Sequence, residues 1–288
     1  MKPPPFAYAD PSELEEALAL LTEHGEDAKL LAGGQSLVPL LNFRLVRPGV
    51  LVDLNRVGGL GRLERRGGAL RIGAMVREAT LERSALVASG WPLLAEAARL
   101  IGHIAIRTRG TAGGSAAHAD PAAELPTCFA ALEARFHCRS LRSSRSLAAA
   151  EFFRGPLETA LAADEMLVGL ELRPLPPRTG TAFLELSRVH GDFALGGAAA
   201  VVTLDGDGRC ERAALALLGA GPVPLRVPAA EELLRGEAVE VAAEEAAEQA
   251  AAVAEPPASD GDRAHRRALL RTLAERALRR AARRAEAQ

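Results

Sequence analysis

The chain has 288 residues, of which 48% are apolar and 25% are charged, and its formal net charge is −2. This apolar content excludes a disordered chain, and the balanced charge excludes a basic protein built to bind nucleic acid. No run of about 20 apolar residues, the length of a membrane-spanning helix, is present. Because Met1–Pro5 also lacks the apolar core of a signal peptide, we expect a cytoplasmic protein with no integral membrane segment.

Common signatures of nucleotide, metal and hydrolase sites are missing from the sequence. The three cysteines, Cys128, Cys138 and Cys210, lack the spacing that holds zinc or an iron–sulfur cluster, so we interpret them as packed thiols. No lysine follows a glycine, which excludes the phosphate-binding P-loop. The patterns G-x-G-x-x-G, H-E-x-x-H and G-x-S-x-G are also absent. We therefore expect no metal site and no catalytic residue of the chain's own.

The N-terminal region is predicted to alternate helices and strands. Asp10, as N-cap before a proline, is typical of a helix start, and Gly25 is typical of its end. A short apolar strand at residues 29–32 follows and breaks at a glycine pair, after which Ser36 can cap a second helix. Another strand is predicted at residues 50–54. This order indicates a small parallel α/β unit.

A hairpin and a longer segment of helices and strands are predicted next. Two alternating apolar runs between Leu60 and Ala74 flank Arg66-Gly67-Gly68, which is typical of a hairpin turn. A glycine-rich segment, Gly110–Ser115, precedes the second of two expected helices. The helices are predicted at residues 91–101 and 120–134, and strands at residues 135–138 and 166–172.

Pro174–Pro177 has the composition of a linker between domains. We therefore place a first domain at residues 1–175, with subdomains at about 1–55 and 56–175, and a second domain at residues 178–288. The second domain is predicted to begin with strands at residues 182–189, 198–204 and 213–218 and to end in three helices.

The helical end of the chain carries two charge runs. Residues 231–262 hold ten acidic residues and one arginine, whereas residues 263–284 hold nine arginines and one glutamate. Because the neighbouring acids would neutralise the field of the arginines, we interpret the runs as complementary solvated helix faces and expect no nucleic-acid partner.

Two glycine segments, Gly33–Ser36 and Gly110–Ser115, stand at the ends of strand-like runs. Glycine pairs let the backbone approach a ligand closely and turn its N–H groups toward that ligand. A helix that starts just beyond adds a positive dipole, which favours phosphate. One such pair is common in turns, but two of matched form predict a site that clasps a diphosphate from both sides.

Five segments, in this order along the chain, resemble the FAD-binding medium subunits of the xanthine dehydrogenase and carbon monoxide dehydrogenase family. They are Leu31–Leu37, Leu51–Leu54, Ile106–Ser115, His118–Pro126 and Arg188–Ala194. The resemblance runs from about Phe6 to the C-terminus. It implies an α+β protein, with an FAD-binding domain of two α/β subdomains in the PCMH-type flavoprotein fold. A smaller C-terminal domain, a three-stranded antiparallel sheet with helices, would follow.

The resemblance also implies a set of residues that bind FAD without a covalent bond. The two glycine segments would wrap the diphosphate through backbone N–H groups, an acid would hydrogen-bond the cofactor, and two residues would lie toward its isoalloxazine ring. In that order the residues are Ala32, Gly33, Gly34, Gln35, Ser36 and Leu37; Thr111, Ala112, Gly113, Gly114 and Ser115; Glu124; and Asp192 and Phe193. Where Phe193 stands, many relatives have tyrosine, so a hydroxyl near the ring is missing.

By the same resemblance, the chain is an electron-transfer subunit of a molybdenum hydroxylase. It would take electrons from [2Fe–2S] clusters on a small subunit and pass them to NAD, a quinone or oxygen, while molybdopterin sits on a large subunit. The assembly implied is a dimer of heterotrimers. Two alternatives remain open: a self-sufficient FAD-dependent oxidoreductase of the same superfamily, and an assembly protein that has lost its flavin.

Polar residues crowd into the short segment Arg188–Ala194, where Gly191 allows a tight bend. Such a cluster is costly to bury without partners. We therefore expect it to face the cofactor or another subunit, at the point where electrons enter. The alternative is an exposed turn between two strands.

Overall fold

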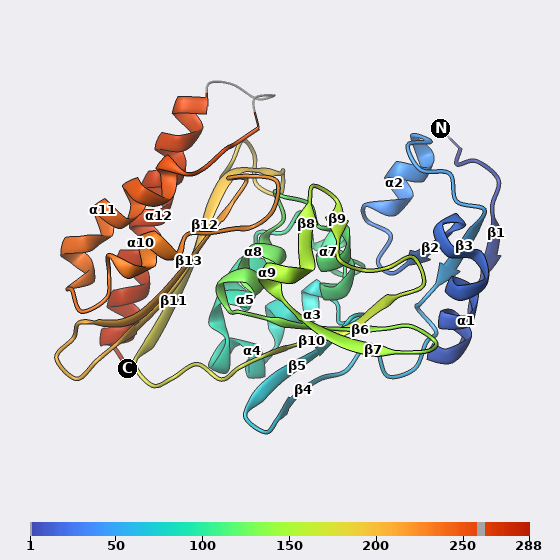
Figure 1. The fold of residues 1–288 in the computed structure, drawn as a ribbon, viewed down its shortest axis with the longest axis horizontal. Coiled ribbons are helices and arrows are strands. Elements are labelled where there is room, and N and C mark those ends of the chain that lie inside the picture. The colour runs from blue at the N-terminus through green and yellow to red at the C-terminus, as the bar shows by residue number, and fades with distance from the viewer. Residues whose placement is uncertain (1, 258–262) are drawn as a thin grey trace.

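The computed structural model describes residues 2–257 and 263–288. Three main β-sheets follow one another along the described part of the chain, and Figure 1 shows them from the N-terminal unit at one end, through a middle unit, to the C-terminal unit at the other. Among the described residues, no helix is both long and apolar enough to cross a membrane.

The N-terminal unit is a parallel three-stranded sheet in the order β1-β3-β2. Its elements are β1 (Ala7–Ala9), α1 (Leu14–His24), the 3-10 turn η1 (Gly25–Asp27), β2 (Ala28–Leu31), α2 (Leu37–Asn42) and β3 (Val50–Asp53). The predicted parallel unit is present, but the helix start at Asp10 is wrong. Helix α1 begins at Leu14, because the Glu16 carboxylate accepts the backbone N–H groups of Ser12 and Glu13 at 3.0 and 3.3 Å and so caps the helix later.

The middle unit is built on an antiparallel five-stranded sheet in the order β4-β5-β10-β6-β7. Its strands are β4 (Leu63–Arg66), β5 (Ala69–Gly73), β6 (Arg135–Arg139), β7 (Ser144–Ala148) and β10 (Met166–Leu172), with a separate pair, β8 (Phe153–Gly155) and β9 (Glu158–Thr159). Its helices are α3 (Glu78–Arg83), α4 (Ala85–Gly90), α5 (Pro92–Ala98), α6 (Ile104–Arg107), α7 (Ala112–His118), α8 (Glu124–Ala131) and α9 (Ala149–Phe152). The predicted hairpin at Arg66-Gly67-Gly68 is confirmed as β4 and β5.

Two helices of this unit differ from their predictions. The second glycine segment is not a loop before a helix, since Gly113 and Gly114 lie in the first turn of α7 itself. Helix α8 begins at Glu124 rather than at Asp120, because the Asp120 carboxylate accepts the N–H of Ala122 at 2.8 Å in a local turn that delays the helix.

The C-terminal unit is an antiparallel sheet in the order β11-β12-β13-β14, covered on one face by helices (Figure 1). Its elements are β11 (Thr179–Ser187), β12 (Ala194–Leu204), β13 (Cys210–Leu218), β14 (Leu225–Arg226), α10 (Pro228–Glu232), α11 (Val239–Ala252) and α12 (Arg263–Glu286). The predicted α+β class is confirmed, and the two-residue β14 is an addition to the three strands expected. The other face of the sheet packs on α5 and α8 of the middle unit, in one shared hydrophobic core.

Alanine and glycine let α12 approach this sheet closely. A Cβ on Gly180 of β11 would lie 2.5 Å from the backbone N of Ala285, a contact that no side chain tolerates.

The two charge runs meet on the outer surface, where Glu240 of α11 pairs with Arg279 and Arg283 of α12 at 3.3 and 3.0 Å. The last part of the acidic run, 258–262, lies outside the described residues. The three cysteines are buried, as predicted.

Candidate functional site

The first glycine segment joins β2 to α2 and presents a row of free backbone donors. Within the described part of the chain, the amide N–H groups of Gly33 to Leu37 have no protein acceptor, whereas the next one, on Val38, donates to the Gly34 carbonyl at 3.0 Å. Gly34 has φ +75°, a left-handed conformation that glycine adopts without strain. Five consecutive unpaired N–H groups form a site that an anion can fill.

The second glycine segment uses its donors inside the protein. Thr111 caps α7 by accepting the N–H of Gly114 on Oγ1 at 3.0 Å, and its carbonyl accepts the N–H of Ser115 at 2.9 Å. The N–H groups of Ala112 and Gly113 donate to carbonyls of the β5–α3 connection at 2.9 Å each. The backbone of this segment is therefore fixed by hydrogen bonds within the protein, and the hydroxyls of Thr111 and Ser115 are its polar side-chain groups.

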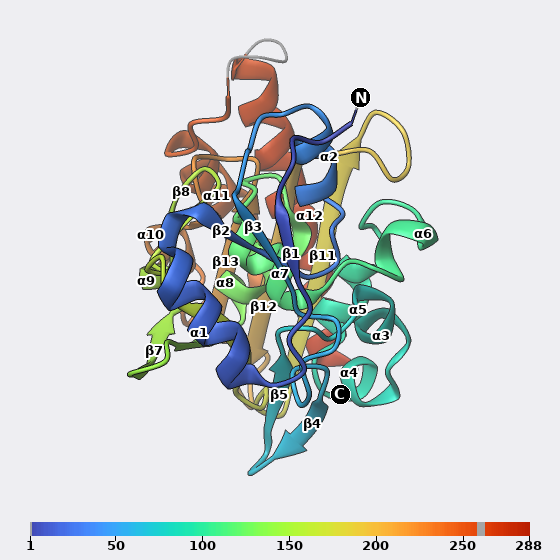
Figure 2. The ribbon, with the colours of Figure 1, turned by 90° about the vertical axis from the view of Figure 1, so that its right-hand side faces the viewer.

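The fold brings the two segments into direct contact. Gly33 lies so close to the second segment that a Cβ on it would be 2.8 Å from Gly110 Cα and closer still to the Arg109 carbonyl oxygen. A Cβ on Gly114 would be 3.6 Å from the Cβ of Ala32. Figure 2 looks onto the N-terminal unit, with β1, β2 and β3 in front of α7.

The sequence reasoning missed two residues at this junction, Asn55 and Arg77, and noted Asp53 only as part of the segment Leu51–Leu54, without a role. Asn55 donates to the Ala32 carbonyl at 3.1 Å, and Arg77 donates to the Asn55 side-chain oxygen at 2.6 Å and to the Arg109 carbonyl. A signal for Asn55 was available. Parallel strands β2 and β3 end at the same edge of a sheet, so polar residues just after β3 lie beside the first glycine segment.

Three glutamates near the second segment, Glu78, Glu124 and Glu185, are buried or half-buried. Burial, together with the nearby charge of Glu185, raises the pKa of Glu124, at the start of α8, to about 8. Burial also raises the pKa of Glu78 to about 7, against the opposing charge of Arg107, and that of Glu185 to about 7. The Glu78 carboxyl fills the space where Gly110 would carry a Cβ. These groups hold protons near neutral pH and can donate hydrogen bonds as well as accept them.

A cavity of about 330 Å³ opens where the middle unit meets the C-terminal unit. Asp120 and Ala122, just before α8, line one side, and Asp192 and Phe193 line the other. Phe193 is 70% exposed. Across the same boundary Gly191, with φ +84°, lies against the His103 ring, where a Cβ would be 2.7 Å from Cε1. The structure thus puts Asp192 and Phe193 on a cavity that adjoins the start of α8.

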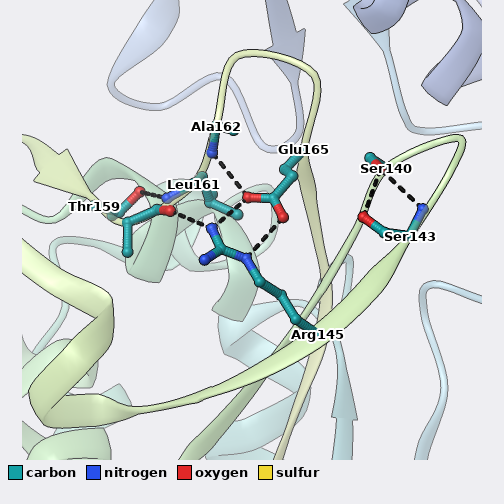
Figure 3. Close-up of polar contacts among 8 residues, drawn as sticks. Ser140, Ser143, Arg145, Thr159, Leu161, Ala162 and Glu165 are labelled. Atoms are coloured by element: carbon teal, nitrogen blue, oxygen red, sulfur yellow. Dashed lines mark hydrogen bonds and ion pairs between the residues drawn. The ribbon is translucent and has the colours of Figure 1, made fainter.

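The segment 158–165 is fastened to β7 by Arg145 (Figure 3). The guanidinium donates to both carboxylate oxygens of Glu165 at 2.8 and 2.6 Å, and to a backbone carbonyl of the segment at 2.6 Å. The hydrogen bond from Arg145 lowers the pKa of Glu165. Just upstream, Leu157 donates its N–H to the Ala119 carbonyl at 3.0 Å. Arg145 therefore holds this segment in place beyond the C-terminal end of α7.

The chain matches two family models over most of its length. Residues 4–175 match the FAD binding domain in molybdopterin dehydrogenase, and residues 181–281 match the CO dehydrogenase flavoprotein C-terminal domain. Among curated proteins, it is 47% identical to the 6-hydroxypseudooxynicotine dehydrogenase complex subunit alpha of Paenarthrobacter nicotinovorans, over 81% of this chain and 79% of that one. It is 38% identical to the carbon monoxide dehydrogenase medium chain of Hydrogenophaga pseudoflava, over 84% and 86% of the two chains.

Solved structures agree with these matches. A chain of carbon monoxide dehydrogenase from Hydrogenophaga pseudoflava superposes with a TM-score of 0.96 at 38% identity, over 99% of both chains. A chain of quinoline 2-oxidoreductase from Pseudomonas putida 86 gives 0.93 at 39% identity, again over 99% of both. The predicted resemblance is confirmed. The chain is an oxidoreductase subunit and belongs to the family of FAD-binding medium subunits of the molybdenum hydroxylases, which includes those of carbon monoxide dehydrogenase.

Proposed function

We propose that the chain holds FAD non-covalently between its two glycine segments and acts as the electron-transfer subunit of a molybdenum hydroxylase. The row of free N–H groups from Gly33 to Leu37 carries this proposal, because a diphosphate is the anion that fits a row of donors beside a second, rigid loop. When bound, FAD supplies redox chemistry that accepts single electrons and releases pairs.

The chain's own residues would divide the work of binding. The segment Ala32–Leu37 would give N–H donors to the diphosphate, and Thr111–Ser115 would close the other side with the hydroxyls of Thr111 and Ser115. Glu124, with a pKa of about 8, keeps its proton at neutral pH and would donate a hydrogen bond to an acceptor atom of the cofactor. Each contact orients the cofactor and leaves the redox step to it.

The segment Arg188–Ala194 would be the place where the ring system and a partner subunit meet. Its side chains Asp192 and Phe193 line the cavity between the units, and Val189 is 68% exposed beside them. We propose a small subunit with [2Fe–2S] clusters as the electron donor, a large molybdopterin subunit beside it, and NAD, a quinone or oxygen as the acceptor. A dimer of such heterotrimers in the cytoplasm is the assembly that the family resemblance implies.

The first experiment measures the cofactor of the purified chain. We expect flavin absorbance, and acid precipitation should release FAD into the supernatant, where chromatography identifies it. A colourless chain that added FAD does not saturate would refute the binding proposal. Flavin that stays with the protein pellet would refute the non-covalent part alone.

The second experiment measures electron entry in the reconstituted complex. Asp192→Ala should slow the bleaching of flavin absorbance by the reducing substrate, while the thermal melt of the isolated subunit stays near that of the parent. An unchanged bleaching rate at full flavin occupancy would make the segment an ordinary exposed turn. Co-purification with the two partner subunits tests the assembly separately.

A further inference from the structure

The hydrogen bonds of Asn55 fix the start of the first glycine segment. Its side-chain nitrogen donates to Asp53 Oδ1 at 2.5 Å and to the Ala32 carbonyl at 3.1 Å, and its backbone N–H donates to Asp53 Oδ1 at 2.9 Å. The other oxygen of Asp53 accepts the Tyr8 hydroxyl at 2.7 Å. Burial alone would raise the pKa of Asp53, but the hydrogen bonds from Tyr8 and Asn55 outweigh it and hold that pKa below its usual value. The carboxylate is therefore a charged anchor for Asn55.

The side chain of Arg77 joins this anchor to the second segment. Its Nη2 donates to Asn55 Oδ1 at 2.6 Å, and its Nη1 donates to the Arg109 carbonyl, the atom against which Gly33 packs. The backbone at Arg77 pairs with Thr111 in an isolated antiparallel bridge. Arg77 thus contacts the second segment through its backbone and the adjoining Arg109 carbonyl through its guanidinium, and it reaches the first segment through Asn55.

The planar guanidinium group of arginine suits this bridging role better than a group that supplies charge alone. Arginine presents donors in fixed directions, so its two acceptors, on Asn55 and Arg109, must keep a set distance from each other. A lysine at the same place would keep the charge but would not hold both acceptors in that geometry. Burial and the neighbouring Arg109 lower the pKa of Arg77, and the charge of Asp53 opposes them.

We propose that Arg77 and Asn55 are positioning residues, which together hold the first glycine segment against the second so that its free N–H groups are set for a diphosphate before the cofactor arrives. The inference rests on the proposed function, since FAD supplies that diphosphate. Neither residue needs to touch the cofactor. Preorganised donors bind more tightly, because the loop is already ordered when the ligand arrives.

The test is a titration of the flavin-free full chain with FAD, followed by quenching of flavin fluorescence. Arg77→Met should raise the Kd for FAD about 10- to 100-fold, by analogy with displacements of about 1 Å in other sites. Arg77→Lys should lose nearly as much, because charge alone does not bridge the segments. The matched control is Arg83→Met, an exposed arginine at the C-terminal end of α3, the helix that Arg77 directly precedes, and it should leave the Kd within about twofold of the parent.

A double-mutant cycle and urea unfolding distinguish a role in positioning the FAD site from a general contribution to the stability of the fold. Asn55→Leu and Arg77→Met should raise the Kd by less together than the product of their separate effects, since each breaks the same bridge. The urea midpoints of the flavin-free variants should stay close to that of the parent. Full affinity in Arg77→Lys, multiplicative effects in the cycle, or an affinity loss that only follows lost stability would each overturn the inference. A parent chain that binds no FAD would instead refute the proposed function.

Discussion

Replacing Gly33 with alanine tests the contact between the two glycine segments directly. The new Cβ would lie 2.8 Å from Gly110 Cα and closer to the Arg109 carbonyl oxygen. Both neighbours are backbone atoms, so neither can rotate away. Carbon atoms pack at about 3.5–4.0 Å, so the segments must part by about 1 Å.

The size of the effect follows from what that movement disturbs. Overpacking of this kind costs about 1–3 kcal/mol of stability. Hydrogen bonds to a charged acceptor are worth about 1.5–3 kcal/mol each. If one or two of the free donors move out of reach, binding weakens by about 3 kcal/mol, which is about 100-fold in Kd. We therefore expect Gly33→Ala to fold, with reduced stability, and to lose most of its FAD.

The assay combines an FAD titration with urea unfolding of the flavin-free protein. Gly90→Ala is the matched control, because a Cβ there meets nothing within 4 Å and the residue ends helix α4. It should keep the parent's Kd and should not lose stability. An FAD affinity for Gly33→Ala within about threefold of that of Gly90→Ala would refute the argument that the contact between segments shapes the site.

Gly114→Val should lower FAD content in the purified protein, since a Cβ there would lie 2.6 Å from Thr111 Oγ1 and disrupt the cap of α7; flavin absorbance per chain measures it. The ordinary pKa of Glu124 is 4.5, and its pKa in the folded chain is about 8. Between these two pH values the folded chain binds a proton that the unfolded chain does not, so the free energy of unfolding falls as the pH rises. Glu124→Gln should remove this pH dependence, which amounts to on the order of 3 kcal/mol of stability lost between pH 4.5 and pH 7. Urea unfolding at pH 5, 7 and 9 measures it. Glu96→Ala should cost about 2 kcal/mol in the same assay, because it frees Arg284 of α12 and leaves a backbone N–H of β11 without its acceptor.

The sequence predicted those parts of the candidate site that depend on backbone conformation. Glycine pairs are visible in a sequence, and the two segments that contain Gly33 and Gly113 do meet in the fold. Strands with a clear apolar pattern were also predictable, such as Met166–Leu172, which is β10 residue for residue. Helix starts were less predictable. Asp120 has the composition of an N-cap, yet its carboxylate forms a local turn, and the helix begins four residues later.

What the sequence could not show are contacts between side chains that are distant along the chain. Arg77 and Asn55 are 22 residues apart, and the carbonyl that Arg77 reaches is 32 residues beyond it. No local pattern marks such a pair, because each residue alone is an ordinary polar residue after a strand or before a helix. The buried Glu78 is similar, since its sequence position at the start of a helix is typical of an exposed acid.

The two glycine segments look alike in sequence, but their hydrogen bonds give them different roles. In the first segment, glycine frees five N–H groups for a ligand. In the second, glycine lets α7 pack against the backbone just after β5, where a Cβ on Gly113 would lie 2.6 Å from Ala74 Cα. This combination suits a diphosphate, because the second segment, whose N–H groups are bonded within the protein, fixes the position of the free N–H donors of the first. We therefore expect Arg77 and Asn55, which hold the first segment against the second, to influence FAD affinity alongside the donors themselves.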